Sequence, residues 1–196
     1  ASLGVGMAQL DIVVLGAAGG ASAAGVYGAV NRWIQPFNML AASVAITITP
    51  SVAKSPTWTR LWQVIRSHRL LLVTASIGGV GVAVSSHGLV NVLLGDGYEE
   101  AAWPLSLLGL GAAFAVWSQP LAASMQALGR EGLVFWLLPS VNAARLILIA
   151  VSADVLSASA AAGAYLVSQA VILMVLSVAV FRGLSAHGEH RRDCWS

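Results

Sequence analysis

Residues 158–181 read ASAAAGAYLVSQAVILMVLSVAVF and contain no charged side chain. A helix needs about 20 mostly apolar residues to cross the hydrocarbon layer of a bilayer. The stretch lacks the polar and apolar alternation of a barrel strand, and an isolated segment in lipid can satisfy its backbone groups only as a helix. We therefore expect this stretch to be a transmembrane helix.

Similar apolar stretches occupy most of the remaining chain. They fall at about residues 1–18, 23–50, 70–94, 104–128 and 132–151. Hydrophobic residues make up 58% of the sequence and charged residues 9%, whereas a soluble domain has about 25% charged residues. The sequence therefore predicts an all-α polytopic membrane protein with six transmembrane helices and a polar tail at 182–196.

A short amphipathic segment separates the second stretch from the third. Its apolar side chains recur at helical spacing opposite its polar ones: Trp58, Leu61, Trp62 and Ile65 against Arg60, Gln63 and Arg66. Tryptophan and basic residues on one helix favour a position in the headgroup region. We also expect Pro36 to kink the second helix and Pro120 to be a possible kink in the fourth.

Basic residues fall on one side of the six expected helices. They are Lys54, Arg60, Arg66, Arg69, Arg130, Arg182, Arg191 and Arg192. The connectors on the opposite side, at 19–22, 95–100 and 152–154, carry no Lys or Arg. Because cytoplasmic loops collect basic residues, we expect a multi-pass protein of the cytoplasmic (inner) membrane with a cytoplasmic carboxyl terminus.

Several other functions lack support in the sequence. The ten Lys and Arg residues form no stripe for nucleic acid, and the single Cys194 provides no internal disulfide. No nucleophile and base pairing is present, so we expect no enzymatic activity, no cofactor and no metal site. The chain begins at Ala1 within an apolar stretch, and we expect that a segment precedes it.

Three charged residues lie inside the apolar stretches: Asp11, Arg32 and Arg145. An unpaired charge in the middle of a membrane costs at least about 2.5–3.5 kcal/mol, so each needs a partner or a wet cavity. Each lies roughly 10–15 Å from the outer end of its helix, so the three can meet at one depth. One alternative is that Asp11 pairs with Arg32 and fixes packing, which leaves Arg145 uncompensated.

The other alternative is a polar substrate cavity. One face of the second stretch carries the polar side chains of Tyr27, Asn31, Gln35 and Asn38. Hydrogen bonds between helices alone would not explain why so many polar side chains gather on one face. The residues that we expect to line the cavity are Arg32, Arg145, Asp11, Asn31, Gln35, Asn38, Asn142 and Gln119. Two guanidinium groups against one carboxylate favour an anionic guest, such as a phosphate or diphosphate headgroup.

The order of several short motifs resembles polysaccharide flippases of the multidrug/oligosaccharidyl-lipid/polysaccharide exporter superfamily. The motifs are DIVVLG at 11–16, AGVYGAVNR at 24–32, LLGDGYEEAA at 93–102, QALGR at 126–130, Asn142 and ASAAAGAYLVS at 158–168. The first glycine of the last pattern is absent here. The resemblance covers about the whole chain.

This resemblance implies a transporter of two helical lobes, with this chain as the second lobe and an N-terminal lobe as its partner. Such proteins turn a polyprenyl-diphosphate-linked sugar across the membrane for polysaccharide biosynthesis, such as O-antigen or capsule export. A basic cavity between the lobes accepts the headgroup, while the lipid tail stays among the membrane lipids. The residues expected to face that cavity are Arg32, Arg145, Asn31, Gln35 and Asn142.

Two other functions stay open. One is a cation- or proton-coupled multidrug antiporter of the same superfamily, in which Asp11 would be the coupling carboxylate. The other is a non-transporting membrane scaffold of a polysaccharide synthesis complex, in which the internal polar groups serve only for packing.

Overall fold

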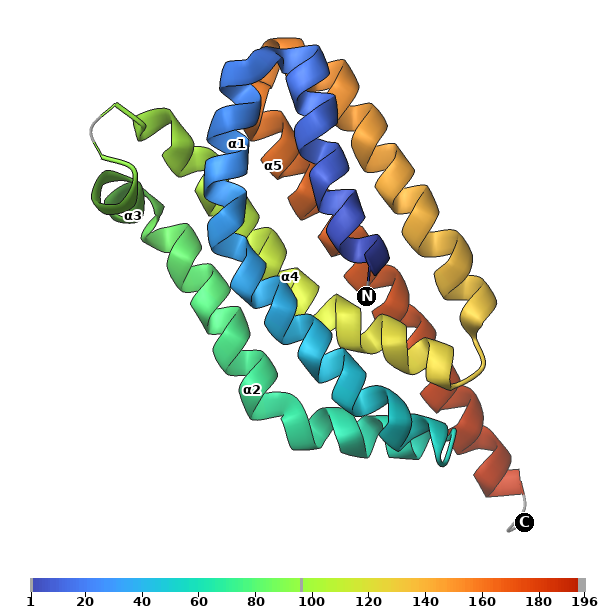
Figure 1. Ribbon diagram of the computed structural model, residues 1–196. Coiled ribbons are helices and arrows are strands. Elements are labelled where there is room, and N and C mark those ends of the chain that lie inside the picture. Colours follow the sequence, from blue (N-terminus) through green and yellow to red (C-terminus); the bar gives the residue numbers. More distant parts are fainter. Residues whose placement is uncertain (1, 96, 194–196) are drawn as a thin grey trace.

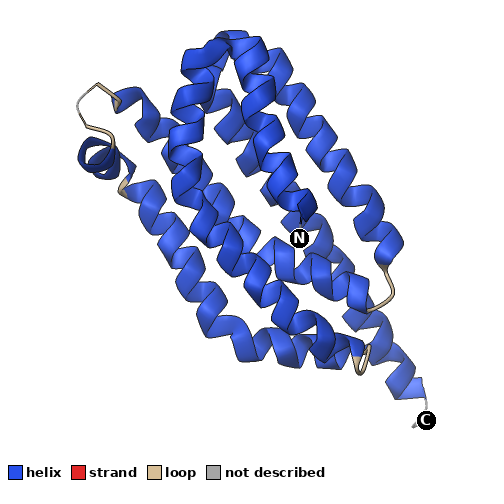
Figure 2. Cartoon of the chain, viewed as in Figure 1, coloured by secondary structure: helices blue, strands red, loops and turns tan. Residues whose placement is uncertain are grey.

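The computed structural model describes residues 2–95 and 97–193, without the side chains of residues 2–9, 153–157 and 185–193. The described chain is almost entirely helical and contains no strand (Figures 1 and 2). Its elements are α1 (Ser2–Ala53), α2 (Trp58–Val84), α3 (Ser86–Leu93), the 3-10 helix η1 (Glu99–Ala101), α4 (Ala102–Ala127) and α5 (Glu131–Asp193). The all-helical prediction is confirmed.

Helix α1 consists of two antiparallel arms, 2–19 and 21–53, which meet at Gly20 (Figure 1). Gly20 has φ 87° and ψ 168°, a backbone conformation that a residue with a Cβ rarely adopts. The chain therefore reverses at the predicted 19–22 connector. Helix α1 continues through Pro36 and α4 through Pro120, so neither proline ends its helix.

Helix α5 also has two arms, which run antiparallel in Figure 1. Within the described residues, five segments are apolar and long enough to cross a membrane: Leu10–Ala53, Trp58–Val84, Glu99–Ala127, Glu131–Ser152 and Ala158–Leu184. Leu10–Ala53 includes the break at Gly20, so it contains parts of two of the six predicted helices. The segments are compatible with a multi-pass membrane protein.

The predicted third helix, 70–94, is wrong at both ends. Helix α2 begins at Trp58, because the amphipathic segment is continuous with it, and Thr57 Oγ1 accepts a hydrogen bond from Arg60 N at 3.3 Å as the helix cap. Helix α2 ends at Val84, since Ser85 has φ −89° and ψ 8° and leaves the helical conformation. The remaining residues form the separate helix α3, which turns away from α2 (Figure 1).

Helix α4 lies at the centre of the bundle and contacts α1, α2 and α5. It approaches α2 closely because both helices have glycine at the contact. A Cβ built on Gly109 would lie 2.8 Å from the Gly79 carbonyl oxygen. Small residues allow such close helix packing in membranes, where dispersion contacts replace the hydrophobic effect.

Connectors alternate between the two ends of the bundle, as predicted (Figure 1). Connectors 54–57 and 128–130 lie at the end that we call the basic end. The opposite end carries exposed Glu99 and Glu100. Asp96, the side chain of Asp154 and the side chains of the tail from Ser185 onward, with Cys194, lie outside the described residues.

Candidate functional site

Arg145 and Asp11 form an ion pair inside the bundle, with Arg145 Nη2 3.0 Å from Asp11 Oδ1. The two side chains are only 5% and 3% exposed. The expected pairing of Asp11 with Arg32 is wrong, and Arg145 has a compensating charge. The reason is that the first arm of α1 lies beside the first arm of α5, which brings Arg145 to Asp11, whereas the second arm of α1 presents Tyr27 to this carboxylate and leaves Arg32 exposed (Figure 1).

Three further side chains join this pair. Tyr27 Oη donates to Asp11 Oδ2 at 3.4 Å, and Arg145 Cζ lies 5.8 Å from the centroid of the Tyr165 ring. Tyr165 Oη in turn donates to Asn38 Oδ1 at 3.2 Å. These five residues, which we call the four-arm network, connect both arms of α1 to both arms of α5.

The four-arm network is suited to fixing helix positions. A buried pair that keeps both partners holds a defined geometry, whereas loss of one partner leaves a buried charge without compensation. Arginine stays protonated in proteins, so Arg145 neutralises Asp11 permanently. The Asp11 carboxylate is therefore already occupied by a cation that belongs to the protein.

Arg32 has a very different environment. It lies on the second arm of α1, is exposed, and makes no ion pair or hydrogen bond within the described part of the chain. It is about 18 Å along the helix from Gly20. In a hydrocarbon layer of about 30 Å with its edge at Gly20, that would be near the middle. Gln35, Ser43 and Thr47 are exposed along the same side of the arm, beside the exposed apolar Met39 and Ile46. We call Arg32, Gln35, Ser43 and Thr47 the polar face of α1.

The exposed sides of α2 and of the second arm of α5 are apolar by comparison. The exposed residues there include Leu70, Ile77, Val80 and Val84 of α2, and Val167, Met174 and Val178 of α5. Such surfaces suit contact with acyl chains, which offer no hydrogen bonds. The polar face of α1 differs from these sides chiefly through Arg32 and Gln35, because Ser43 and Thr47 donate to carbonyls of their own helix.

The other expected cavity residues do not gather around Arg32. Asn31 is buried and Gln119 is half-buried. Asn142 Nδ2 donates to the Leu138 carbonyl of its own helix at 2.8 Å. Of the eight expected residues, the structure brings Asp11, Asn38 and Arg145 together in the network and places Arg32 and Gln35 on the polar face.

Sequence reasoning missed Tyr165. Its ring packs directly over α4, since a Cβ on Gly111 would lie 2.6 Å from Tyr165 Cδ1. A single tyrosine in an apolar stretch gives no periodic signal. However, its Oη donates a hydrogen bond to Asn38, and its ring face contacts the Arg145 guanidinium.

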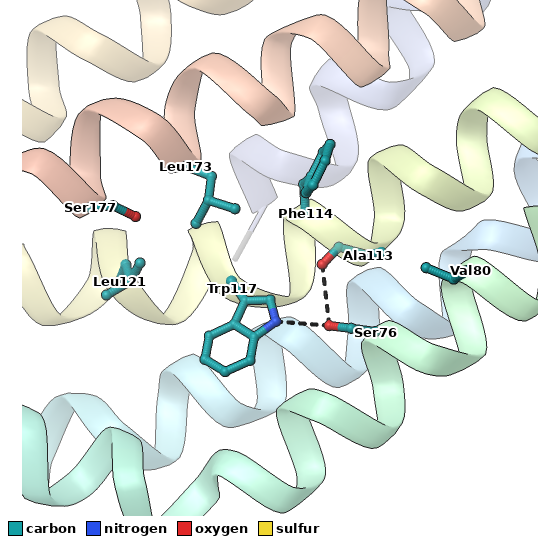
Figure 3. A pocket seen from close by; sticks show the side chains of 8 residues that line it. All are labelled: Ser76, Val80, Ala113, Phe114, Trp117, Leu121, Leu173 and Ser177. Carbon is teal, nitrogen blue, oxygen red and sulfur yellow. Dashed lines mark hydrogen bonds between the residues drawn. The ribbon is translucent and has the colours of Figure 1, made fainter.

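A shallow groove of about 470 Å³ lies between α2, α4 and the second arm of α5 (Figure 3). Its lining residues are Ser76, Val80, Ala113, Phe114, Trp117, Leu121, Leu173 and Ser177. Trp117 Nε1 donates to Ser76 Oγ at 2.8 Å, and Ser76 Oγ lies within donor distance of the Leu72 carbonyl at 2.9 Å. The Ser76 hydroxyl and the Trp117 indole N–H are therefore already hydrogen-bonded, and neither needs a polar ligand as a partner.

Comparisons of the chain with protein-family models, with curated proteins and with solved structures found no match. The function is therefore argued from the residues: a neutral buried network, an open arginine on a polar face, and apolar surfaces elsewhere.

Proposed function

We propose that the chain is one lobe of a flippase that moves lipid-linked oligosaccharide across the cytoplasmic membrane by alternating access, as in the multidrug/oligosaccharidyl-lipid/polysaccharide exporter superfamily. The observation that carries the proposal is that Arg32 is exposed and has no ion-pair partner in the described part of the chain. Counting residues from Gly20 would put it near mid-membrane depth. The proposal assigns no enzymatic step to the protein.

Arg32 is expensive to expose to acyl chains. A central arginine costs at least about 2.5–3.5 kcal/mol on insertion scales, and more when it faces hydrocarbon without water. Gln35 is exposed on the same side, one helical turn from Arg32, so this part of the polar face suits water or a polar partner surface. The Ser43 and Thr47 hydroxyls donate to carbonyls of their own helix and make no such demand. A water-filled cavity between this bundle and a second lobe supplies both.

The sign of the open charge favours an anionic guest. Asp11 cancels Arg145, so Arg32 is the guanidinium that remains available for a ligand. A guanidinium fork binds phosphate oxygens bidentately, which fits the diphosphate of a lipid-linked sugar. This corrects the sequence argument from two open guanidinium groups to one, and the lipid linkage itself rests on the resemblance.

The orientation belongs to the same proposal. The basic end, with Lys54 and Arg130, faces the cytoplasm, because short cytoplasmic loops collect basic residues. The end with Glu99 and Glu100 then faces outward, and the carboxyl terminus is cytoplasmic. A headgroup bound at Arg32 would move from the cytoplasmic side of the membrane to the outer side.

The membrane scaffold is a second candidate, and the four-arm network favours it. That network uses Asp11 and Arg145 for packing, as a scaffold requires. The cation antiporter has less support, since a carboxylate held by arginine cannot exchange its partner for a transported ion as readily as a free one. Arg32 separates the scaffold from the flippase, since packing within the bundle does not use it.

The test is a flipping assay in proteoliposomes with protein expressed from its complete gene. The substrate is a fluorescent polyprenyl-diphosphate-linked sugar, and the measurement is the fraction that reaches the outer leaflet with time. We expect Arg32→Ala to lower the initial rate at least tenfold, and Arg32→Lys to retain part of it. Ile77→Ala, on the apolar side of α2, is the matched control and should behave as the unmodified protein.

Three outcomes separate the candidates. An unchanged flipping rate in Arg32→Ala refutes the flippase. Uptake of an organic cation that disappears in Asp11→Asn identifies the antiporter instead. A protein that flips nothing, and that still supports polysaccharide assembly with Asp11, Arg32 and Arg145 all changed to leucine, is a scaffold.

A further inference from the structure

The basic end of the bundle carries six exposed basic side chains: Lys54, Arg60, Arg66, Arg69, Arg130 and Arg182. None of them forms an ion pair with a residue in the described part of the chain. The described acidic side chain at this end is the exposed Glu131, whereas the described charges at the opposite end are Glu99 and Glu100. The bundle is therefore electrically asymmetric along its long axis.

The first part of α2, residues 58–69, lies across the basic end, whereas the rest of α2 runs along the bundle (Figure 1). Leu61 and Val64 are buried on its inner side. Ser67 Oγ donates to the Val64 carbonyl at 2.7 Å, and His68 Nδ1 lies 2.9 Å from the same oxygen. Side chains that compete for a helix carbonyl in this way bend helices, which accounts for the change in direction.

Trp58 fixes this segment to the bundle. Its indole packs against the backbone of Gly183, where a Cβ would collide with the ring. Arg130 Cζ lies 5.2 Å from the centroid of the Trp58 ring, a cation–π contact. The beginning of α2, the 128–130 connector and α5 thus form one continuous surface.

We infer that this surface is a binding site for the headgroups of anionic phospholipids. We call it the basic collar, and it consists of Lys54, Arg60, Arg66, Arg69, Arg130 and Arg182. Unpaired basic residues next to a membrane attract anionic headgroups, and their contributions add. The inference concerns the annular lipid and does not depend on the proposed transport function.

The apolar side chains beside the basic collar select a lipid over a free anion. Trp62 is 51% exposed and Leu70 is 76% exposed, so both need an apolar phase next to the charged residues. An amphiphile with an anionic head and an acyl tail meets both requirements at once. Tryptophan is enriched at this boundary in membrane proteins for the same reason.

Lipid retention tests the inference. The protein is reconstituted in nanodiscs of equal phosphatidylcholine and phosphatidylglycerol, extracted in mild detergent, and its retained lipid is measured by mass spectrometry. We expect severalfold enrichment of phosphatidylglycerol, and a fall to the bulk ratio in the triple variant Arg60→Gln, Arg66→Gln, Arg69→Gln. The matched variant with three Arg→Lys changes should keep the enrichment, and so should Glu99→Gln with Glu100→Gln.

Enrichment that persists in the triple glutamine variant overturns the inference. Complete loss of the enrichment in millimolar inorganic phosphate, with sodium chloride of equal ionic strength having no effect, identifies a free-anion site and also overturns it. If the triple variant does not fold, the three single Arg→Gln variants replace it, and each should lose part of the enrichment. The assay measures no transport. A negative result would therefore overturn the lipid-binding inference without affecting the flippase proposal.

Discussion

Arg145 and Asp11 lie opposite each other between the first arm of α5 and the first arm of α1, with 3.0 Å between Arg145 Nη2 and Asp11 Oδ1. The pair is almost completely removed from the surface, and Tyr27 and Tyr165 contact it. Arg145 Nε is buried without a hydrogen-bond partner among the described residues. Such a pair stabilises little by itself, because desolvation offsets most of the attraction. What it supplies is a defined register between two helix arms that are distant in the sequence.

Breaking this pair on one side should therefore be severe, while removing both charges should be mild. We expect Asp11→Leu and Arg145→Leu each to lower the free energy of unfolding by about 3–5 kcal/mol, since each leaves a buried charge alone. The double variant should recover most of that loss. Denaturant unfolding in detergent micelles, followed by circular dichroism, measures all three.

Arg32→Leu is the matched control, because this arginine is exposed and has no described partner. It should change stability by less than either single variant at the buried pair. Additive losses in the double variant would contradict a direct coupling between Asp11 and Arg145.

The residue types and hydropathy of the sequence predicted much of this fold. Apolar stretches located the helices, and the glycines at 19–22 located the reversal at Gly20. The depth of Asp11 and Arg145 was also predicted well enough that the two side chains could meet. Depth follows from counting residues along a helix, which the sequence gives directly.

The partner of Asp11 could not be predicted in the same way. A hydrophobic pattern tells how a helix is oriented toward the core, but it does not tell which helix lies beside it. The first arm of α1 has neighbours on both sides, and the choice of Arg145 over Arg32 depends on how α5 packs. The break at Ser85 was missed because the prediction treats residues 70–94 as one apolar stretch, although the run of Ser85, Ser86, His87 and Gly88 interrupts it.

The contact between α2 and α4 should not tolerate a methyl group. In Gly109→Ala the new Cβ would lie 2.8 Å from the Gly79 carbonyl oxygen and 2.9 Å from Ala83 N, both of them backbone atoms. Overpacking of this kind costs about 1–3 kcal/mol, so the unfolding midpoint should fall. Gly81→Ala, where nothing lies within 4 Å, is the control and should be neutral or slightly stabilising. Equal stability of the two variants would contradict the close crossing.

The hydrogen bond between Trp117 and Ser76 should contribute only slightly to stability. Trp117→Phe removes the Nε1 donor, which lies 2.8 Å from Ser76 Oγ, and leaves the hydroxyl near its own helix carbonyl. Side-chain hydrogen bonds in membrane proteins average about 0.6 kcal/mol. A double-mutant cycle with Ser76→Ala should give a coupling free energy of this size. A coupling above about 2 kcal/mol would show that the groove in Figure 3 has a larger structural role than its shallow shape indicates.

Lys54 and Glu100 should lie on opposite sides of the membrane. Between them the chain crosses the bundle once, through α2, so labels at the two positions report on opposite ends (Figure 1). In a Cys194→Ser background, the test places a cysteine at one position at a time, through Lys54→Cys or Glu100→Cys, and applies a membrane-impermeant maleimide. The basic residues near Lys54 predict a cytoplasmic location, so Lys54→Cys should react in inverted vesicles and Glu100→Cys in right-side-out vesicles. The reverse result would overturn the proposed orientation, and reaction of both in the same vesicles would contradict a single crossing by α2.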